Sequence, residues 1–156
     1  MSALIDQKLN EYFQPEQIQN AFRQYEKAKQ DAFDESIIDI RMGADGISYA
    51  TFSNELDLRC QVISNRVLKG TYQFYPFREV NISKPSGGKR VLSIATIRDV
   101  LVQKLLYELL YDDIEAKFKK TSKLDSVSWA YRKQKSAQSA ATFIHSCINQ
   151  GFQICF

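Results

Sequence analysis

The sequence is poor in the residues that build disulfide frameworks and metal centres. It has three cysteines and one histidine among 156 residues. The cysteines are odd in number and show no C-x-x-C spacing, which favours reduced, buried thiols in a cytoplasmic protein. His145 has no neighbour at metal-ligand spacing except Cys147, so we expect no zinc site. We expect His145 to lie on a helix surface or in ordinary packing.

Long apolar runs are also missing. No stretch approaches the roughly 20 apolar residues that span a bilayer. The N-terminal run MSALIDQKLNEYF has an early acidic residue and lacks the basic-then-apolar order of an export signal. The content of 44% hydrophobic and 25% charged residues is ordinary for one soluble globular domain. We therefore expect a cytoplasmic location and no membrane partner.

Charge is distributed unevenly along the chain. Residues 1–68 carry 7 Lys and Arg against 11 Asp and Glu, a balance of −4. Residues 69–135 carry 14 against 7, a balance of +7, and residues 136–156 carry none of these residue types. A basic middle segment after an acidic start is typical of a surface that faces phosphate groups.

The start of the chain has the apolar periodicity of two helices. One is predicted over Ala3–Phe13, where apolar residues recur on one helical face. Pro15 suits the first position of a second helix, because proline lacks the N–H that this position leaves unpaired. The apolar stripe of the second helix comprises Ile18, Phe22 and Tyr25 and continues toward Phe33.

A turn and a third helix are predicted next. Two glycines and an aspartate break the periodicity at Met42–Gly46. Ser48 can cap the following helix, and Gly70 is well placed to end it. The core-facing residues of this third helix are predicted to be Phe52, Leu56, Ile63 and Val67.

A β-hairpin is predicted after Gly70. Thr71–Ser83 is rich in aromatic and β-branched residues, and its last residues alternate apolar with polar. Pro76 suits an edge or a bend. Lys84–Lys89 is predicted as a turn in which the glycines adopt positive φ, and Arg90–Ile94 returns as the second strand.

Two further helices and the beginning of a sheet complete the predicted elements. Thr96 and Asp99 resemble a capping box with Asp in place of Glu, which opens a long apolar helix. Ser136 caps a last helix that Gly151 ends, and residues 152–156 begin a buried strand. The apolar positions of the long helix are Ile97, Val100, Leu101, Leu105, Leu109, Ile114 and Phe118, and the inward positions of the last are Ala140, Phe143, Ile144, Cys147 and Ile148. The predicted fold class is α+β, mostly helical with one hairpin.

The hairpin concentrates positive charge. The four cations of this segment are Lys84, Lys89, Arg90 and Arg98. No acidic residue lies among them, and the turn glycines allow backbone N–H groups to approach a ligand. Lysine and arginine are the side chains that bind phosphate, so a phosphate-binding surface is one interpretation. The alternative is a solvent-exposed hairpin whose lysines protect its edges.

The order of motifs from residue 40 to residue 145 resembles that of bacterial reverse transcriptases of the group II intron and retron type. In that family a Gly-Tyr segment precedes an I-x-K strand, a glycine-rich turn, an R-x-L-x-I strand and a helix that begins with D-R. The corresponding segments here are Gly70–Tyr72, Ile82–Lys84, Ser86–Gly88, Arg90–Ile94 and Asp99 with Gln103. A G-x-D-G-I-S turn precedes them at Gly43–Ser48, and an S-x-x-[FY]-R-x-x-[KR]-S block follows at Ser128–Ser136.

The resemblance implies a fingers subdomain whose hairpin closes over the substrate. Lys84 and Arg90 would contact the triphosphate of an incoming nucleotide, and Arg90 would also stack over its base. Gly87 and Gly88 would let the hairpin bend over the substrate. The further nucleic-acid contacts implied are Lys89, Arg98, Arg132 and Lys133, the last two near the templating strand. The family's arginine follows the aspartate of the D-R motif, whereas here Arg98 precedes it.

The resemblance also implies two Mg²⁺ ions in the complete enzyme, held by aspartates that this sequence lacks. In the family the first follows an apolar strand, and the others form a later Tyr-x-Asp-Asp turn. The run Leu110–Asp113 has no residue between Tyr and the Asp pair, and it lies in a helical pattern. We therefore expect Asp112 and Asp113 to be exposed helix residues, and no catalytic or metal-binding residue in this sequence.

The leading hypothesis is the N-terminal part of an RNA-directed DNA polymerase. It divides into an N-terminal helical extension (residues 1–41), the fingers region (42–135) and an incomplete start of the palm (136–156), whose first strand begins at residue 152. The expected partners are an RNA template, a DNA primer, a deoxynucleoside triphosphate and the remainder of the polymerase. The isolated chain is expected to be inactive, because the catalytic aspartates would lie beyond it.

Two other hypotheses stay open at the level of sequence. One is a stand-alone nucleic-acid-binding protein derived from a fingers domain, and the other is a structural or interaction domain. A reading frame that continues into an Asp and a later Tyr-x-Asp-Asp favours the polymerase, and a stop codon favours the stand-alone protein. Absence of salt-dependent binding of RNA or DNA favours the interaction domain.

The predicted strand at residues 152–156 leaves apolar surface and backbone groups without partners. We therefore expect purified chains to self-associate through this edge. Light scattering over a concentration series should show an apparent mass that rises with concentration. A mass that stays at the monomer value over the whole series would contradict this prediction.

Overall fold

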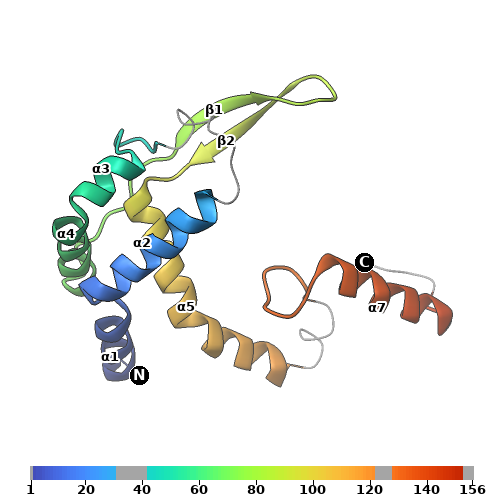
Figure 1. The fold of residues 1–156 in the computed structure, drawn as a ribbon. Helices are drawn as coiled ribbons and strands as arrows, with labels where there is room; N and C mark the ends of the chain where they lie inside the picture. Colours follow the sequence, from blue (N-terminus) through green and yellow to red (C-terminus); the bar gives the residue numbers. More distant parts are fainter. Residues whose placement is uncertain (1, 31–41, 122–127, 153–156) are drawn as a thin grey trace. The chain divides into compact units, whose positions relative to one another are not determined.

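The computed structural model describes residues 2–30, 42–121 and 128–152. In these residues the chain forms six helices and one two-stranded antiparallel sheet, which confirms the predicted α+β class (Figure 1). The helices are α1 (Ser2–Tyr12), α2 (Pro15–Gln30), α3 (Tyr49–Asn54), α4 (Leu56–Leu68), α5 (Ile97–Lys120) and α7 (Ala137–Asn149). The strands are β1 (Arg78–Ser83) and β2 (Lys89–Ile94). None of the described helices combines the length and the apolarity that crossing a membrane requires.

The chain divides within α5 into two units, residues 1–109 and residues 110–156. The first contains α1 to α4, both strands and the first half of α5, and the second contains the rest of α5 and α7. The domain boundaries predicted after residues 41 and 135 stay predictions. The strand predicted at residues 152–156 lies almost wholly outside the described residues, and Phe152 belongs to no strand.

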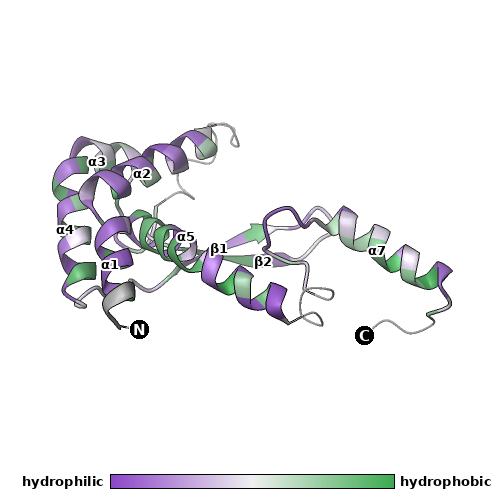
Figure 2. Ribbon diagram, turned by 90° about the horizontal axis from the view of Figure 1, so that it is seen from below, coloured by the Kyte–Doolittle hydropathy of each residue, from purple (hydrophilic) through white to green (hydrophobic). Residues whose placement is uncertain are grey.

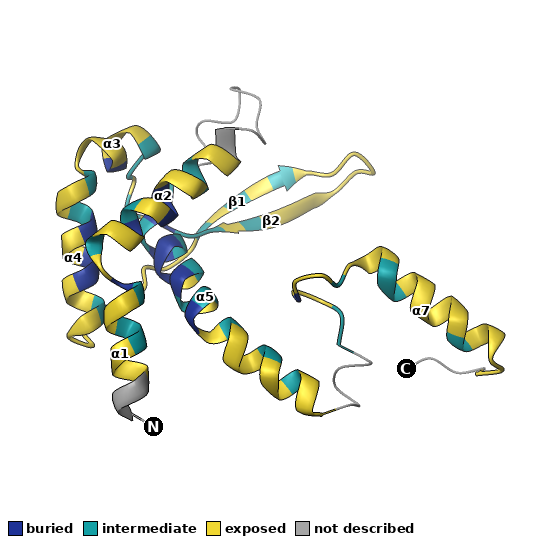
Figure 3. Ribbon diagram, turned by 60° about the horizontal axis from the view of Figure 1, so that its bottom comes forward, coloured by how far each residue is buried: buried dark blue, intermediate teal, exposed yellow. Residues whose placement is uncertain are grey.

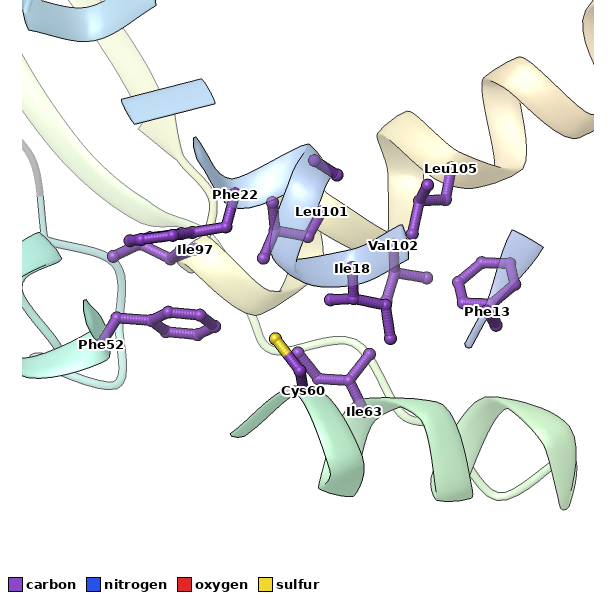
Figure 4. Packing of buried hydrophobic residues seen from close by; sticks show 11 residues of the cluster. Phe13, Ile18, Phe22, Phe52, Cys60, Ile63, Ile97, Leu101, Val102 and Leu105 are labelled. Atoms are coloured by element: carbon purple, nitrogen blue, oxygen red, sulfur yellow. The ribbon is translucent and has the colours of Figure 1, made fainter. Parts of the chain in front are cut away.

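The core of the first unit lies between α2, α4 and α5, with contributions from α3 and the end of α1 (Figure 3). The stacked rings of Phe22 and Phe52, 5.0 Å apart between centroids, join α2 to α3. The predicted stripe of α2 is confirmed at Ile18 and Phe22, which are fully buried, and at Tyr25, which packs against the core, while Phe33 lies outside the described residues. The cluster, most of which Figure 4 labels, comprises Phe13, Ile18, Ala21, Phe22, Phe52, Cys60, Ile63, Ile97, Leu101, Val102 and Leu105.

The third predicted helix is two helices, because the chain bends at Glu55. This residue has φ −116° and ψ 26°, outside the helical region, so the prediction of one continuous helix is wrong. The bend separates α3 from α4, and Phe52 and Ile63 both reach the core. Ser48 caps α3 as predicted, since its hydroxyl oxygen accepts a hydrogen bond from the Thr51 N–H at 3.1 Å.

The hairpin is shorter than predicted, because β1 begins at Arg78 and not at Thr71. Residues 71–77 instead form an irregular segment whose backbone bonds to side chains at the start of α5. The two strands pair in antiparallel register from Arg78↔Ile94 to Ser83↔Lys89. The hairpin extends away from the helices of its unit (Figure 1).

Cys60 and His145 follow the predictions, whereas Cys147, predicted to be buried, is only half-buried. Cys60 is fully buried on α4, and burial, with the nearby Asp57 carboxylate, raises its pKa to about 11. It therefore stays protonated near neutral pH and packs as a small hydrophobe. Cys147 is a free thiol that is half-buried on α7, and Cys155 lies outside the described residues. His145 lies exposed on the α7 surface.

The apolar side chains of α7 are not buried in the described part of the second unit. Ser136 caps this helix as predicted, but Phe143, Ile144 and Ile148 are 41%, 42% and 59% exposed. Figure 3 colours most of α7 as exposed. Figure 2 shows the hydrophobic residues along α7 in green. The Trp129 ring, 5.5 Å from that of Phe143 between centroids, covers only part of them. The predicted inward orientation is wrong here, because the described residues of this unit supply too little apolar surface to cover the helix.

The turn before α3 packs closely against the start of α5. A Cβ on the buried Gly43 would lie 2.5 Å from the Thr96 Cα and 2.8 Å from the Thr96 nitrogen. The Gly46 N–H bonds to the Gly43 carbonyl at 3.1 Å, and Asp45 Oδ1 accepts a hydrogen bond from the Ile47 N–H at 3.2 Å. Only a residue without a side chain allows this approach of two backbones.

We expect Gly43→Ala to destabilise the chain, because the Thr96 backbone cannot move aside as a flexible side chain would. The free energy of unfolding should fall by about 1–3 kcal/mol, the usual effect of overpacking a filled interior. Urea denaturation followed by circular dichroism measures this change. Ala44→Ser, at the exposed neighbouring position, should change the free energy by less than about 0.5 kcal/mol. Equal losses in the two variants would argue against the close contact.

Candidate nucleic-acid interface

The tip of the hairpin is a tight turn that depends on two glycines. The Lys84 N–H bonds to the Gly88 carbonyl at 3.0 Å, and the Gly87 N–H bonds to the Lys84 carbonyl at 3.0 Å. Gly87 and Gly88 have φ values of 84° and 83°, which L side chains rarely adopt. No atom lies within 4 Å of the position that a Cβ would take on either glycine, so the tip is open.

The basic residues of the tip stand on both sides of the ribbon. Ile82 pairs with Arg90, and Ser83 pairs with Lys89, so Arg90 and Lys89 stand on opposite faces. Lys84 lies one residue beyond the last strand pair, with its N–H bonded to the Gly88 carbonyl, and the alternation of β1 extended by one residue puts it on the face of Arg90. The two residues predicted to contact a nucleotide therefore share one face, and Lys89 lies on the other.

Lys84, Lys89 and Arg90 are all exposed, and Figure 3 colours the tip of the hairpin as exposed. Within the described part of the chain, no hydrogen bond or ion pair holds the side chain of Lys84, Lys89 or Arg90. Exposed cations without an acidic partner remain available to an anion, and lysine and arginine together offer point-charge and bidentate contacts. The hairpin is therefore a suitable surface for phosphate groups.

The base of the hairpin is held by the Asp99 carboxylate, which is only 2% exposed. Its Oδ1 accepts a hydrogen bond from the Tyr72 hydroxyl at 2.7 Å, and its Oδ2 accepts one from the Tyr75 N–H at 2.9 Å. A carboxylate loses its hydrogen bonds to water when it is buried, and these two bonds take their place. The Thr96 hydroxyl accepts a bond from the Asp99 N–H at 3.3 Å, as the capping box predicts. The capping box also predicts a second hydrogen bond, from the backbone at the start of the helix to the Asp99 carboxylate. This prediction is wrong, because the carboxylate bonds to the segment before the hairpin.

Arg98 packs beside the same carboxylate. Its Cζ lies 4.8 Å from the Tyr72 ring centroid and 4.6 Å from that of Tyr75. Its Nε donates to the Tyr72 hydroxyl oxygen at 3.2 Å, and its Nη2 donates to the Gln73 carbonyl at 2.6 Å. Arg98, a predicted nucleic-acid contact, is thus engaged within the chain at the base of the hairpin and not at its tip.

Arg132, in the second unit, is buried and paired with Glu115. Its Nη2 and Nε donate to the two carboxylate oxygens at 2.5 Å and 3.0 Å, and its Nη1 donates to the Ser128 carbonyl at 2.9 Å. All three nitrogens of the guanidinium therefore bond within the chain and hold this loop against α5. The adjacent Lys133 is exposed, with its Nζ 4.3 Å from the Tyr111 ring centroid. The structure does not bring these two residues together with the hairpin tip in one unit.

The described residues do not fit a pair of Mg²⁺ ions. No three His, Cys, Asp or Glu side chains in this part of the chain come close enough together to hold a metal ion. Asp112 and Asp113 lie exposed on α5, as predicted for helix residues.

The Asp99 anchor is the feature that sequence reasoning missed. The capping-box interpretation assigns its carboxylate to the helix backbone, and the motif pattern gives Tyr72 no contact with it. A signal was present in the sequence, because a tyrosine-rich segment precedes an aspartate in the first turn of the next apolar helix. Arg98, next to that aspartate, bonds to the same segment.

The chain is similar to two curated proteins. Over 78 residues, 50% of this chain, it is 38% identical to a Saccharomyces cerevisiae protein named for intron 1 of COX1/OXI3, of which the match covers 9%. Over 98 residues, 63% of this chain, it is 29% identical to the protein YkfC of Escherichia coli, of which the match covers 24%. The chain thus spans a small part of the length of either relative. No family model matches the sequence.

We expect Tyr72→Phe to lower the free energy of unfolding by about 1–3 kcal/mol, because it removes a donor from a buried carboxylate. Tyr75→Phe is the matched control, since Asp99 bonds to the backbone N–H of Tyr75 and not to its hydroxyl. Urea denaturation at pH 7 measures both variants. A loss in Tyr75→Phe as large as that in Tyr72→Phe would contradict the anchor.

The stabilisation by Tyr72 should depend on pH. Burial, together with the hydrogen bond to Asp99, raises the pKa of the Tyr72 hydroxyl above its ordinary value near 10. The folded state therefore keeps this proton at a pH where the unfolded state has lost it, and the stabilisation falls as pH rises above about 10. The difference in unfolding free energy between the unchanged chain and Tyr72→Phe should shrink from pH 9 to pH 11. A constant difference would contradict the raised pKa.

Proposed function

We propose that this chain forms the fingers part of an RNA-directed DNA polymerase, a reverse transcriptase, and contacts the incoming nucleotide and the template. The observation that carries the proposal is the anchored hairpin with the exposed cations Lys84, Lys89 and Arg90 at its tip. In phosphoryl transfer the protein mainly positions the reactants and neutralises their charge. A ribbon that presents lysine and arginine from a fixed base suits this task.

The two faces of the hairpin suit two different contacts. Lys84 and Arg90 share one face and would bind the phosphates of a deoxynucleoside triphosphate, with the arginine also able to stack on the base. Gly87 and Gly88 leave the tip open around them, so that the turn can come close to the phosphates. Lys89, on the opposite face, would contact the nucleic-acid strand.

The remaining predicted residues take supporting roles in this proposal. Arg98 would act through the base of the hairpin, because its donors are engaged by Tyr72 and Gln73. Arg132 would fix its loop through Glu115, which leaves the exposed Lys133 for the template. The distant similarity to an intron 1 protein of yeast supports an assignment to a family whose members are encoded in introns.

The chemistry itself is assigned to the remainder of the polymerase. Two Mg²⁺ ions would activate the primer hydroxyl and stabilise the leaving pyrophosphate, and the described residues offer no site for them. We therefore expect the purified chain to bind nucleic acid and to leave a primer unextended in the presence of Mg²⁺ and deoxynucleotides. Primer extension by this chain alone would contradict the proposal.

The hairpin is tested by reversing its charge in the triple variant Lys84→Glu, Lys89→Glu and Arg90→Glu. Fluorescence anisotropy with a labelled single-stranded RNA should show weaker binding at low salt. With no triphosphate present, all three cations are free to contact the strand, so the slope of log K against log salt should fall in magnitude by about 2, at about 0.7 for each phosphate contact of a single strand. The tip is exposed and open, so the fold should be retained, and circular dichroism checks this.

The matched control reverses the same number of charges at the end of α5, with Lys117→Glu, Lys119→Glu and Lys120→Glu. These residues are exposed and belong to the second unit. The three substitutions at the end of α5 should reduce RNA binding less than the hairpin variant does, because they act only through the net charge of the chain. Equal losses in the two triple variants would show that binding follows net charge alone and would remove the support for the hairpin.

A further inference from the structure

A cavity of about 300 Å³ lies in the first unit beside α3 and α4, and none of its lining residues belongs to the hairpin. Leu58 and Val62 are 62% and 41% exposed, so its apolar wall is open to solvent. A volume of this size is at the lower end of ligand pockets and suits a single small aromatic ligand. The apolar residues of the wall are Ile47, Phe52, Leu58, Val62 and Ile63.

Three arginines and two acidic residues line the same cavity, and the Nε of Arg98 is paired with the adjacent Asp99 carboxylate at 3.6 Å. Glu55 is bonded to Arg59 at 2.6 Å, and Asp45 accepts a hydrogen bond within its own turn. Arg59 keeps an unused donor, because its buried Nε has no acceptor in the described part of the chain. Arg66 is exposed and has no ion pair with a described residue. The third arginine, Arg98, closes the cavity on the side of the hairpin base.

Tyr75 adds a flat surface to the cavity. Its side chain is 44% exposed, and the Cζ of Arg98 lies 4.6 Å from its ring centroid. Exposed aromatic rings beside arginines are the surfaces on which proteins stack the bases of single-stranded nucleic acids. We propose that this cavity binds one nucleotide, with its base against Tyr75 and the apolar wall and its phosphate at Arg59 and Arg66.

The choice of a nucleotide over an acidic peptide rests on the proposed function and on the exposed Tyr75 ring. The same chemistry is offered by a free mononucleotide and by the terminal nucleotide of a single strand. Either source brings one base and one phosphate to the cavity. The probes below distinguish these two sources from each other and from a peptide.

The experiment titrates the full chain with adenosine monophosphate, with a 5′-phosphorylated hexanucleotide and with a peptide of glutamates and one phenylalanine. NMR spectroscopy follows the Nε–H signal of Arg59, which reports on the cavity and not on the hairpin. We expect both nucleotide probes to shift this signal. A similar affinity for the two identifies a free nucleotide as the ligand, and tighter binding of the hexanucleotide identifies a strand terminus.

Variants of exposed residues test the contacts. Arg66→Glu and Tyr75→Ala should each weaken nucleotide binding by about tenfold or more, since one removes a charged donor and the other a stacking surface. Lys27→Glu, exposed on α2 and outside the cavity, makes the same charge change as Arg66→Glu and should stay within about twofold.

The cavity site would be overturned by no shift of the Arg59 signal with either nucleotide probe at millimolar concentration, by a shift with the peptide alone, or by equal effects of Arg66→Glu and Lys27→Glu. The site would also be overturned if the hairpin triple variant abolished hexanucleotide binding and Arg66→Glu left that binding intact. In that case the proposed function would stand. Nucleotide binding that only the cavity variants weaken would support the site and count against the hairpin.

Discussion

The carboxylate of Asp99 accepts hydrogen bonds from the Tyr72 hydroxyl and from the Tyr75 N–H inside the first unit. It lies in the first turn of α5, where the helix N-terminus favours a negative group. A carboxylate that is 2% exposed needs such donors, so the segment before the hairpin cannot be placed independently of α5. The hairpin continues from this segment, and Tyr75 and Arg98 line the cavity beside it. One buried group therefore positions both candidate binding surfaces.

The family-like motifs divide into residues that hold the fold and residues that face solvent. Gly43 permits close approach to Thr96, and Ser48 caps α3. Arg132 belongs to the same group, because its guanidinium is bonded to Glu115. Within the described residues, no hydrogen bond or ion pair holds the side chains of the cations at the hairpin tip. A match between motifs therefore does not by itself distinguish a structural arginine from one that contacts a ligand. The burial of the side chain makes that distinction.

Local patterns predicted much of the fold, and contacts between distant residues account for what they missed. The buried positions of α2 and α4 follow from helical periodicity, which needs only neighbouring residues. The start of β1 at Arg78, and not at Thr71, goes with bonds from Asp99 to residues 24 and 27 positions away, which leave no periodic signature. The burial of Arg132 likewise depends on Glu115, 17 positions away. For α7, periodicity indicates an apolar face, but it cannot say what covers that face.

A ribbon that is fixed at one end and open at the other behaves as a lever arm. Six residues of strand at about 3.3 Å each place the tip of the hairpin roughly 20 Å from its base. A rotation of about 10° at the base would then displace the tip by roughly 3.5 Å, more than the length of an N–H···O hydrogen bond. A small change in the packing of Tyr72 and Asp99 is thereby amplified into the gain or loss of a phosphate contact at Lys84.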